Sequence, residues 1–172
     1  MKKVYFSWFK ISSLMHNVIR GLHNDAWRPD YVVGIVRGGN YPAGLYSHYT
    51  GVPMYTLKVQ LKAGAGENTK DDVEHNAWMS EDAHNGKKIL IFDDINDSGK
   101  TLQWIKKDWQ ESAFPDDVRW SKIWHDSVRF ACLIENTGSD FEVDYIGDIV
   151  NKIDDPQWVV FPWEEWWNLP TF

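Results

Sequence analysis

The chain has 172 residues, a size that fits one domain with a sizeable core, and 43% of them are hydrophobic. Its formal net charge of −7 argues against nucleic acid or an anionic membrane as a partner. The sequence has a single cysteine, no signal-peptide pattern and no apolar stretch of about 18 residues, so we expect a cytoplasmic protein that does not enter a membrane.

The apolar pattern, read in chain order, predicts helices that alternate with strands. Ser7 is a candidate N-cap for a helix with one continuous apolar stripe, which stops near Asn24. Pro42 favours the first turn of a second helix that ends near Gly51. A third helix is expected from Lys100 to Ser112. The expected strands are residues 31–36, 54–61, 88–92, 128–134 and 145–150. This alternation predicts a single α/β domain over residues 1–172, with a Rossmann-like parallel sheet and flanking helices.

Residues 62–76 interrupt this pattern. They are polar and rich in glycine, and they show no apolar period, so we expect a long mobile loop. A loop of this length in a compact domain is usually functional or disordered. Both a lid over a site and a plain surface loop remain open.

The most informative segment is residues 89–101. An apolar run, 89–92, predicts a buried strand that leads into two carboxylates, Asp93 and Asp94. A third carboxylate and a phosphate-binding type of turn follow at the start of the next helix: Asp97, Ser98, Gly99, Lys100 and Thr101. Ligands of open α/β sheets bind at the carboxyl ends of the strands, and such turns present N–H groups to phosphate. The nearby acids would then need hydroxyls or a divalent cation, so the pattern predicts a sugar phosphate.

This segment admits two other interpretations. A nucleotide P-loop needs a glycine five residues before its second glycine, but Asp94 stands there, so that reading fails. The acids could also simply cap the next helix, and we expect Ser98 to serve as its N-cap in any case. Three aspartates within five residues, 93–97, favour a functional role over capping alone.

Three segments resemble the type I phosphoribosyltransferases, and in particular the purine (xanthine/guanine/hypoxanthine) members. Residues 89–102 resemble their signature for 5-phosphoribosyl-1-pyrophosphate (PRPP). Residues 33–39 form a strand that ends in Arg-Gly-Gly, and residues 158–164 are similar to the C-terminal part of the purine enzymes. The resemblance implies a lid at about residues 62–76 and a small base-binding hood at about residues 150–172.

The resemblance also implies a role for each site residue. The 5′-phosphate would bind to Asp97, Ser98, Gly99, Lys100 and Thr101. Asp93 and Asp94 would hold the ribose hydroxyls and Mg²⁺. Pyrophosphate would bind to Arg37, Gly38 and Gly39, and the family suggests a strained peptide bond before Arg37, of which the cis form is one version.

The implied base site contains one departure from the family. Asp97 would be the general base, Trp158 would stack on the base, and main-chain groups of Val159 would read its edge. Glu135 stands where purine-type members carry a lysine that donates to the 6-oxo group. An acceptor there would disfavour a 6-oxopurine and favour a 6-amino group, unless another donor, Lys152 or Asn136, takes the lysine's place.

The expected activity is therefore transfer of ribose 5-phosphate from PRPP to a purine or purine-like base, with release of pyrophosphate, as in nucleotide salvage. The expected partners are PRPP and a nucleobase, the expected cofactor is Mg²⁺, and the chain is expected to form a homo-oligomer, a dimer or a tetramer. The alternative is a non-catalytic PRPP-sensing regulatory protein on the same fold.

Overall fold

The computed structural model describes residues 1–59 and 77–168 of the chain. The expected lid, residues 62–76, lies outside the described residues, as do residues 169–172 at the end of the expected hood. The elements in chain order are β1 (Lys2–Tyr5), α1 (Trp8–Asn24), β2 (Tyr31–Val36), α2 (Asn40–Thr50), β3 (Met54–Lys58), α3 (Ala77–His84), β4 (Ile89–Asn96), α4 (Lys100–Ser112), α5 (Trp120–Asp126), β5 (Val128–Asn136), β6 (Tyr145–Val150), β7 (Gln157–Val160) and the short 3-10 helix η3 (Trp166–Asn168).

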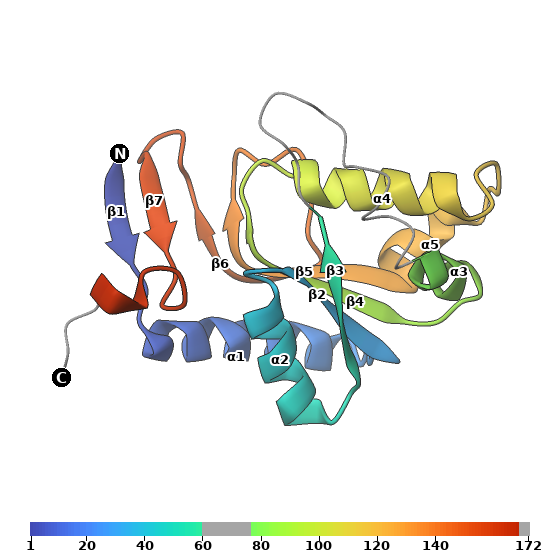
Figure 1. Cartoon of the computed structure of the whole chain (residues 1–172), viewed down its shortest axis with the longest axis horizontal. Coiled ribbons are helices and arrows are strands. Elements are labelled where there is room, and N and C mark those ends of the chain that lie inside the picture. Colours follow the sequence, from blue (N-terminus) through green and yellow to red (C-terminus); the bar gives the residue numbers. More distant parts are fainter. Residues whose placement is uncertain (60–76, 169–172) are drawn as a thin grey trace.

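A five-stranded sheet in the order β3-β2-β4-β5-β6 forms the body, and every neighbouring pair of its strands is parallel. Helices α1 and α2 cover one face, and α3, α4 and α5 cover the other (Figure 1). Parallel sheets covered on both faces have strands that are apolar throughout, as residues 89–92 are. The predicted fold class is confirmed.

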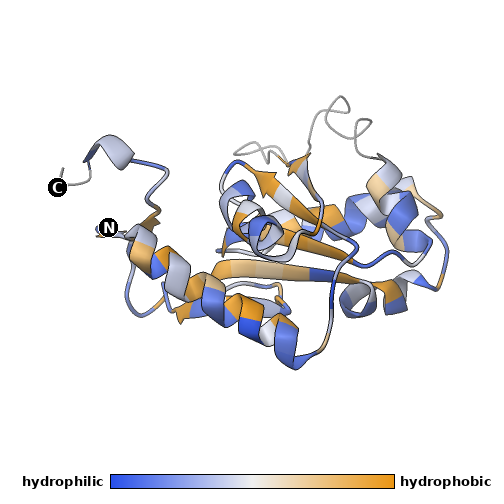
Figure 2. Ribbon diagram, turned by 90° about the horizontal axis from the view of Figure 1, so that it is seen from below, coloured by the Kyte–Doolittle hydropathy of each residue, from blue (hydrophilic) through white to orange (hydrophobic). Residues whose placement is uncertain are grey.

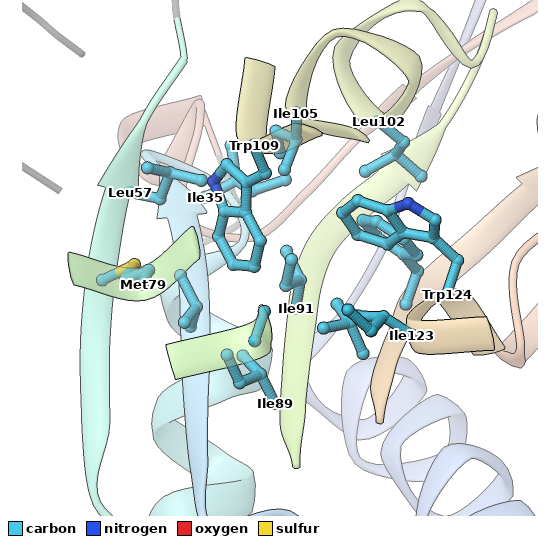
Figure 3. Close-up of a cluster of buried hydrophobic side chains, with 14 of the residues drawn as sticks. Ile35, Leu57, Met79, Ile89, Ile91, Leu102, Ile105, Trp109, Ile123 and Trp124 are labelled. Carbon is cyan, nitrogen blue, oxygen red and sulfur yellow. The ribbon is translucent and has the colours of Figure 1, made fainter. Parts of the chain in front are cut away.

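Two apolar clusters, one on each face of the sheet, form the core. The α1 stripe packs into one of them through Ile11, Leu14, Met15, Val18 and Leu22. On the other face, side chains of β2, β3 and β4 meet those of α3, α4 and α5, as Figure 3 shows for Ile91, Ile105 and Trp124. In Figure 2 the strands of the main sheet are largely hydrophobic, whereas the helices carry both hydrophobic and hydrophilic residues. In the part of the chain that the structure describes, no helix is long and apolar enough to cross a membrane.

A second, two-stranded sheet joins the two ends of the chain, because β1 pairs in parallel with β7. It forms the hood beside the carboxyl end of the main sheet (Figure 1). Stacked rings fasten it to the body: Trp163 lies between Phe161, at 4.9 Å, and Tyr41 of α2, at 4.3 Å between ring centroids. The hood is thereby held next to the start of α2.

The structure corrects several predicted element boundaries. Strand β4 continues to Asn96 and β5 to Asn136, so Asp93 and Asp94 lie within a strand rather than after it. The ladder explains this, since Asp93 pairs with Cys132 and Asn96 with Glu135. The prediction missed α3, α5, β1 and β7. Helices α3 and α5 have eight and seven residues, too few for a clear helical period, and β1 and β7 have four residues each, the shortest length at which a strand pattern can be recognised.

Candidate active site

The acidic pair and the Arg-Gly-Gly turn meet at the carboxyl ends of β4 and β2. A Cβ atom added to Gly38 would lie 1.7 Å from Oδ2 of Asp94, so this carboxylate rests directly against the glycine. A Cβ atom on Gly39 would lie 2.2 Å from the carbonyl oxygen of Phe92. Only glycine lets the turn sit this close to β4. Two segments that the sequence singled out separately therefore form one surface.

Arg37 precedes these glycines, and its peptide bond with Val36 is cis, in agreement with the expectation from the family resemblance. The Arg37 side chain is exposed. Within residues 1–59 and 77–168 it forms no ion pair, so its guanidinium is available to an anion. Guanidinium groups bind phosphate oxygens through two parallel hydrogen bonds.

Burial dominates the electrostatics of Asp93 and Asp94. It raises the pKa of Asp93 well above its usual value, and the charge of Asp94 raises it further. Burial likewise raises the pKa of Asp94 to about 6, and the nearby Glu164 of the hood adds to this. No lysine or arginine of the described residues forms an ion pair with either acid. Such a pair gains most from a ligand that brings hydroxyl donors or a cation.

The turn between β4 and α4 encloses a small cavity of about 70 Å³, lined by residues 95–102 and Asp93. Its volume is far below the roughly 300 to 1,000 Å³ of a pocket for a whole small molecule, and it suits a single tetrahedral group. Gly99 has a left-handed backbone with φ of 79°, and an added Cβ atom would lie 2.7 Å from Cβ of Phe141. Both facts require glycine at this position.

Gly99, and not Ser98 as the sequence suggested, is the N-cap of α4. In the described residues no side chain caps this helix, and Ser98 is exposed at the turn. The capping prediction is wrong because the left-handed glycine already fixes the entry to the helix. The first N–H groups of a 13-residue helix consequently remain free to bind an anion.

Asp97 is held in place by one side chain from the end of β5 and one from the connection between β6 and β7. The amide Nδ2 of Asn136 donates to the main-chain oxygen of Asp97 at 2.9 Å and to its Oδ1 at 3.1 Å. The ammonium of Lys152 lies 3.0 Å from Oδ2. Asn136 also accepts, through Oδ1, the main-chain N–H of Lys152 at 3.1 Å. These contacts orient the carboxylate at the mouth of the site.

Trp158 lies in β7 with half of its surface exposed, whereas the neighbouring Val159 is buried. The ammonium of Lys152 lies 5.8 Å from the centroid of the Trp158 ring. The structure thus brings Asp97, Lys152 and Trp158 together, although they come from three distant parts of the chain. The exposed ring is available for stacking.

Glu135 makes contacts that the sequence did not predict. Its Oε1 accepts from the Asn96 amide at 3.3 Å, and its Oε2 lies 3.7 Å from Sγ of Cys132. Asn96 is buried and also donates to the main-chain oxygen of Phe141 at 2.7 Å. Partial burial raises the pKa of Glu135. Its role toward the base stays a prediction, but this carboxylate already has partners within the protein.

The comparisons with known proteins agree with this geometry. A family model described as "Phosphoribosyl transferase domain" matches residues 7–168. A xanthine-guanine phosphoribosyltransferase of Cereibacter sphaeroides is 27% identical over 145 residues, which cover 84% of this chain and 74% of that protein.

Two solved structures share the fold. A purine phosphoribosyltransferase from Pyrococcus horikoshii has a TM-score of 0.66 and 24% identity, with coverage of 100% of this chain and 99% of that one. The xanthine-guanine-hypoxanthine phosphoribosyltransferase of Helicobacter pylori has a TM-score of 0.63 and 18% identity, with coverage of 94% and 92%. Because the family model spans nearly the whole chain, this protein belongs to the phosphoribosyl transferase domain family.

Proposed function

We propose that the protein transfers the 5-phosphoribosyl group of PRPP to a purine base and releases pyrophosphate. The observation that carries the proposal is the meeting, at one edge of the sheet, of a phosphate-sized cavity, a partly buried acidic pair and the Arg-Gly-Gly turn. The names of the relatives, xanthine-guanine and purine phosphoribosyltransferases, support a purine as the acceptor.

The residues around the cavity suit the ends of PRPP. The 5′-phosphate would enter the turn of residues 97–101, where N–H groups at the start of α4 and the hydroxyls of Ser98 and Thr101 can donate to it. Pyrophosphate would meet Arg37 and the N–H groups of Gly38 and Gly39. The ribose would lie between these anions, with its hydroxyls donating to Asp93 and Asp94.

The same two carboxylates fit a substrate-bound Mg²⁺. Among the described residues, no three His, Cys, Asp or Glu side chains form a metal cage. Mg²⁺ commonly binds through one or two carboxylates plus substrate phosphates, and that is the donor set that Asp93 and Asp94 offer beside PRPP. When bound, the ion would neutralise charge on the departing pyrophosphate. We therefore propose dependence on Mg²⁺.

In the reaction the bond from C1′ to the pyrophosphate oxygen breaks, and pyrophosphate leaves with the electron pair. A bond from C1′ to a ring nitrogen of the base forms, and that nitrogen loses its proton. Asp97 is the proposed proton acceptor, because its carboxylate is oriented by Asn136 and lies near the exposed Trp158 platform. A general base typically contributes about 10² to 10⁴ in rate.

The test is a panel of purine and pyrimidine bases, each offered with PRPP and Mg²⁺ to the full chain, with pyrophosphate release as the readout. We expect release that requires a purine and stops when Mg²⁺ is chelated. Samples without base measure hydrolysis of PRPP. Tight PRPP binding in calorimetry without release on any base would instead favour the regulatory alternative.

Substitutions at the two glycines of the turn are expected to affect different properties, PRPP affinity in one case and stability in the other. Gly38→Ala places its Cβ atom against the Asp94 side chain, which can move, so we expect PRPP affinity to fall at least about tenfold while the fold persists. Gly39→Ala meets main-chain atoms of Phe92 and Ile35, so we expect the free energy of unfolding to fall by roughly 1 to 3 kcal/mol. Calorimetry and urea denaturation measure the two effects. Unchanged PRPP affinity in Gly38→Ala would contradict the role given to Asp94.

Two further expectations continue as proposals. We propose that the protein acts in the cytoplasm and that it forms a dimer or a tetramer, as the family resemblance implies. Light scattering measures the second point directly, and a monomer at micromolar concentration would contradict it.

A further inference from the structure

We propose that Lys152, in the connection between β6 and β7, is the residue that selects an oxo group on the purine base. The inference rests on the proposed function and assigns the specificity of that site to a side chain outside its sequence motifs. It also replaces the expectation that Glu135 favours a 6-amino group.

The Lys152 ammonium is held in a fixed position beside Asp97. Its side chain is only 15% exposed, and Nζ is anchored 3.0 Å from Oδ2 of Asp97. The main chain is anchored as well, since the Lys152 N–H donates to Oδ1 of Asn136. An ammonium group has three donors, and Asp97 is the one ion-pair partner of Nζ among the described residues. The remaining donors are therefore available to a ligand.

The ammonium of Lys152 also lies beside the exposed ring of Trp158. Nζ lies 5.8 Å from the centroid of the Trp158 ring, close to the outer limit of about 6 Å for a cation–π contact, so the ring itself holds it weakly. A planar base stacked on the exposed ring would bring its edge to the ammonium. Because the Asp97 carboxylate lies next to this ammonium, a ring nitrogen of the same base would at the same time face Asp97.

The hydrogen-bonding character of the ammonium determines which substituent of the base it can bind. An ammonium only donates, so it pairs with a carbonyl oxygen and leaves an amino group unpaired against it. Sites built to hydrogen-bond one substrate group reject the analogue that lacks it, because buried polar groups are left without partners. Lys152 therefore favours a purine with an oxo group over adenine.

Glu135 does not oppose this selection. Its two carboxylate oxygens contact Asn96 and Cys132, on the face of the sheet that carries α4. The acceptor that replaces the family's lysine is thus already engaged. The donor comes from the connection that follows β6, the strand that pairs with β5. The family's lysine and Lys152 would reach the base from different elements.

The experiment compares two products that differ at the 6-position of the purine. Calorimetry measures the affinities of inosine and adenosine monophosphate for the full-length wild type, Lys152→Met and the control Lys107→Met, which removes an exposed lysine of α4. We expect the wild type to prefer the inosine nucleotide, Lys152→Met to reduce this preference at least tenfold, and Lys107→Met to leave it unchanged. In turnover, Lys152→Met should lower kcat/KM for hypoxanthine far more than it changes the KM for PRPP.

Two outcomes would overturn the inference. Equal losses of affinity for both nucleotides would mean that Lys152 acts only by orienting Asp97. A preference that survives in Lys152→Met but disappears in Glu135→Gln would make Glu135 the reader of the base. Failure of the proposed function looks different: the wild type would then release no pyrophosphate with any base, while the nucleotide preference would still report on Lys152.

Discussion

Replacing Asp97 with asparagine is expected to lower kcat by about 10²- to 10⁴-fold, because the variant keeps the shape of the side chain but cannot accept the proton of the base. The ion pair of Oδ2 with Lys152 is lost in this variant, but the hydrogen bond from Asn136 can persist on the amide oxygen, so the turn should keep its form. PRPP affinity should consequently change by less than about threefold, as expected for a group that acts mainly in the transition state.

Steady-state pyrophosphate release gives kcat, and calorimetry gives the PRPP affinity. Ser98→Ala is the matched variant on the next residue, where loss of a hydroxyl should weaken PRPP binding more than it lowers turnover at saturating PRPP. Equal losses of turnover and affinity in Asp97→Asn would mean that Asp97 only shapes the phosphate turn. Turnover that stays within tenfold of the wild type would assign the proton to another acceptor.

Much of the geometry of the proposed PRPP half of the site could be predicted from the sequence, because its residues are local. The acids, the turn and the start of α4 lie within residues 93–101, and a buried apolar strand fixes where they emerge. The boundary error at Asp93 has a specific cause: the ladder with β5 continues through these acids, and pairing between distant strands leaves no local signal.

The proposed base half of the site depends on contacts between distant segments. Asp97 meets Asn136 of β5 and Lys152 beyond β6 only because these strands are neighbours in the sheet. The sequence could propose Lys152 and Asn136 as alternative donors, but it could not say that one of them is an anchored ammonium beside Trp158. Likewise, β1 and β7 have four residues each and pair across almost the full length of the chain.

The second large effect is expected at Asp94, where one substitution should weaken PRPP binding and at the same time raise the free energy of unfolding. Asp94→Asn removes a negative charge that the ribose hydroxyls and Mg²⁺ would use, so PRPP affinity with Mg²⁺ should fall at least tenfold, about 1.4 kcal/mol. In the wild type, protonation has the same effect. Because burial raises the pKa of Asp94 to about 6, PRPP affinity should weaken as the pH falls through 6.

The stability of the free protein should move the other way. Folding raises the pKa of Asp94 from 3.8 to about 6, so the folded state holds the proton more tightly than the unfolded chain does. The free energy of unfolding therefore falls as the pH rises between these values, and the loss is complete above pH 6. Asparagine carries no charge to bury and can still accept the N–H of Ile95. We expect Asp94→Asn to be more stable than the wild type by about 1 to 3 kcal/mol at pH 7.5 and nearly equal to it at pH 4.

Urea denaturation at the two pH values measures this difference, and Asp108 supplies the control. Burial and the nearby Glu111 raise the pKa of Asp108 to about 6 as well, but it lies on α4, outside the site. Asp108→Asn should therefore also stabilise the protein at pH 7.5, while PRPP affinity stays unchanged. If Asp94→Asn binds PRPP as the wild type does, the charge of Asp94 does not contribute to substrate binding. If the variant unfolds more easily at pH 7.5, that charge does not destabilise the free protein.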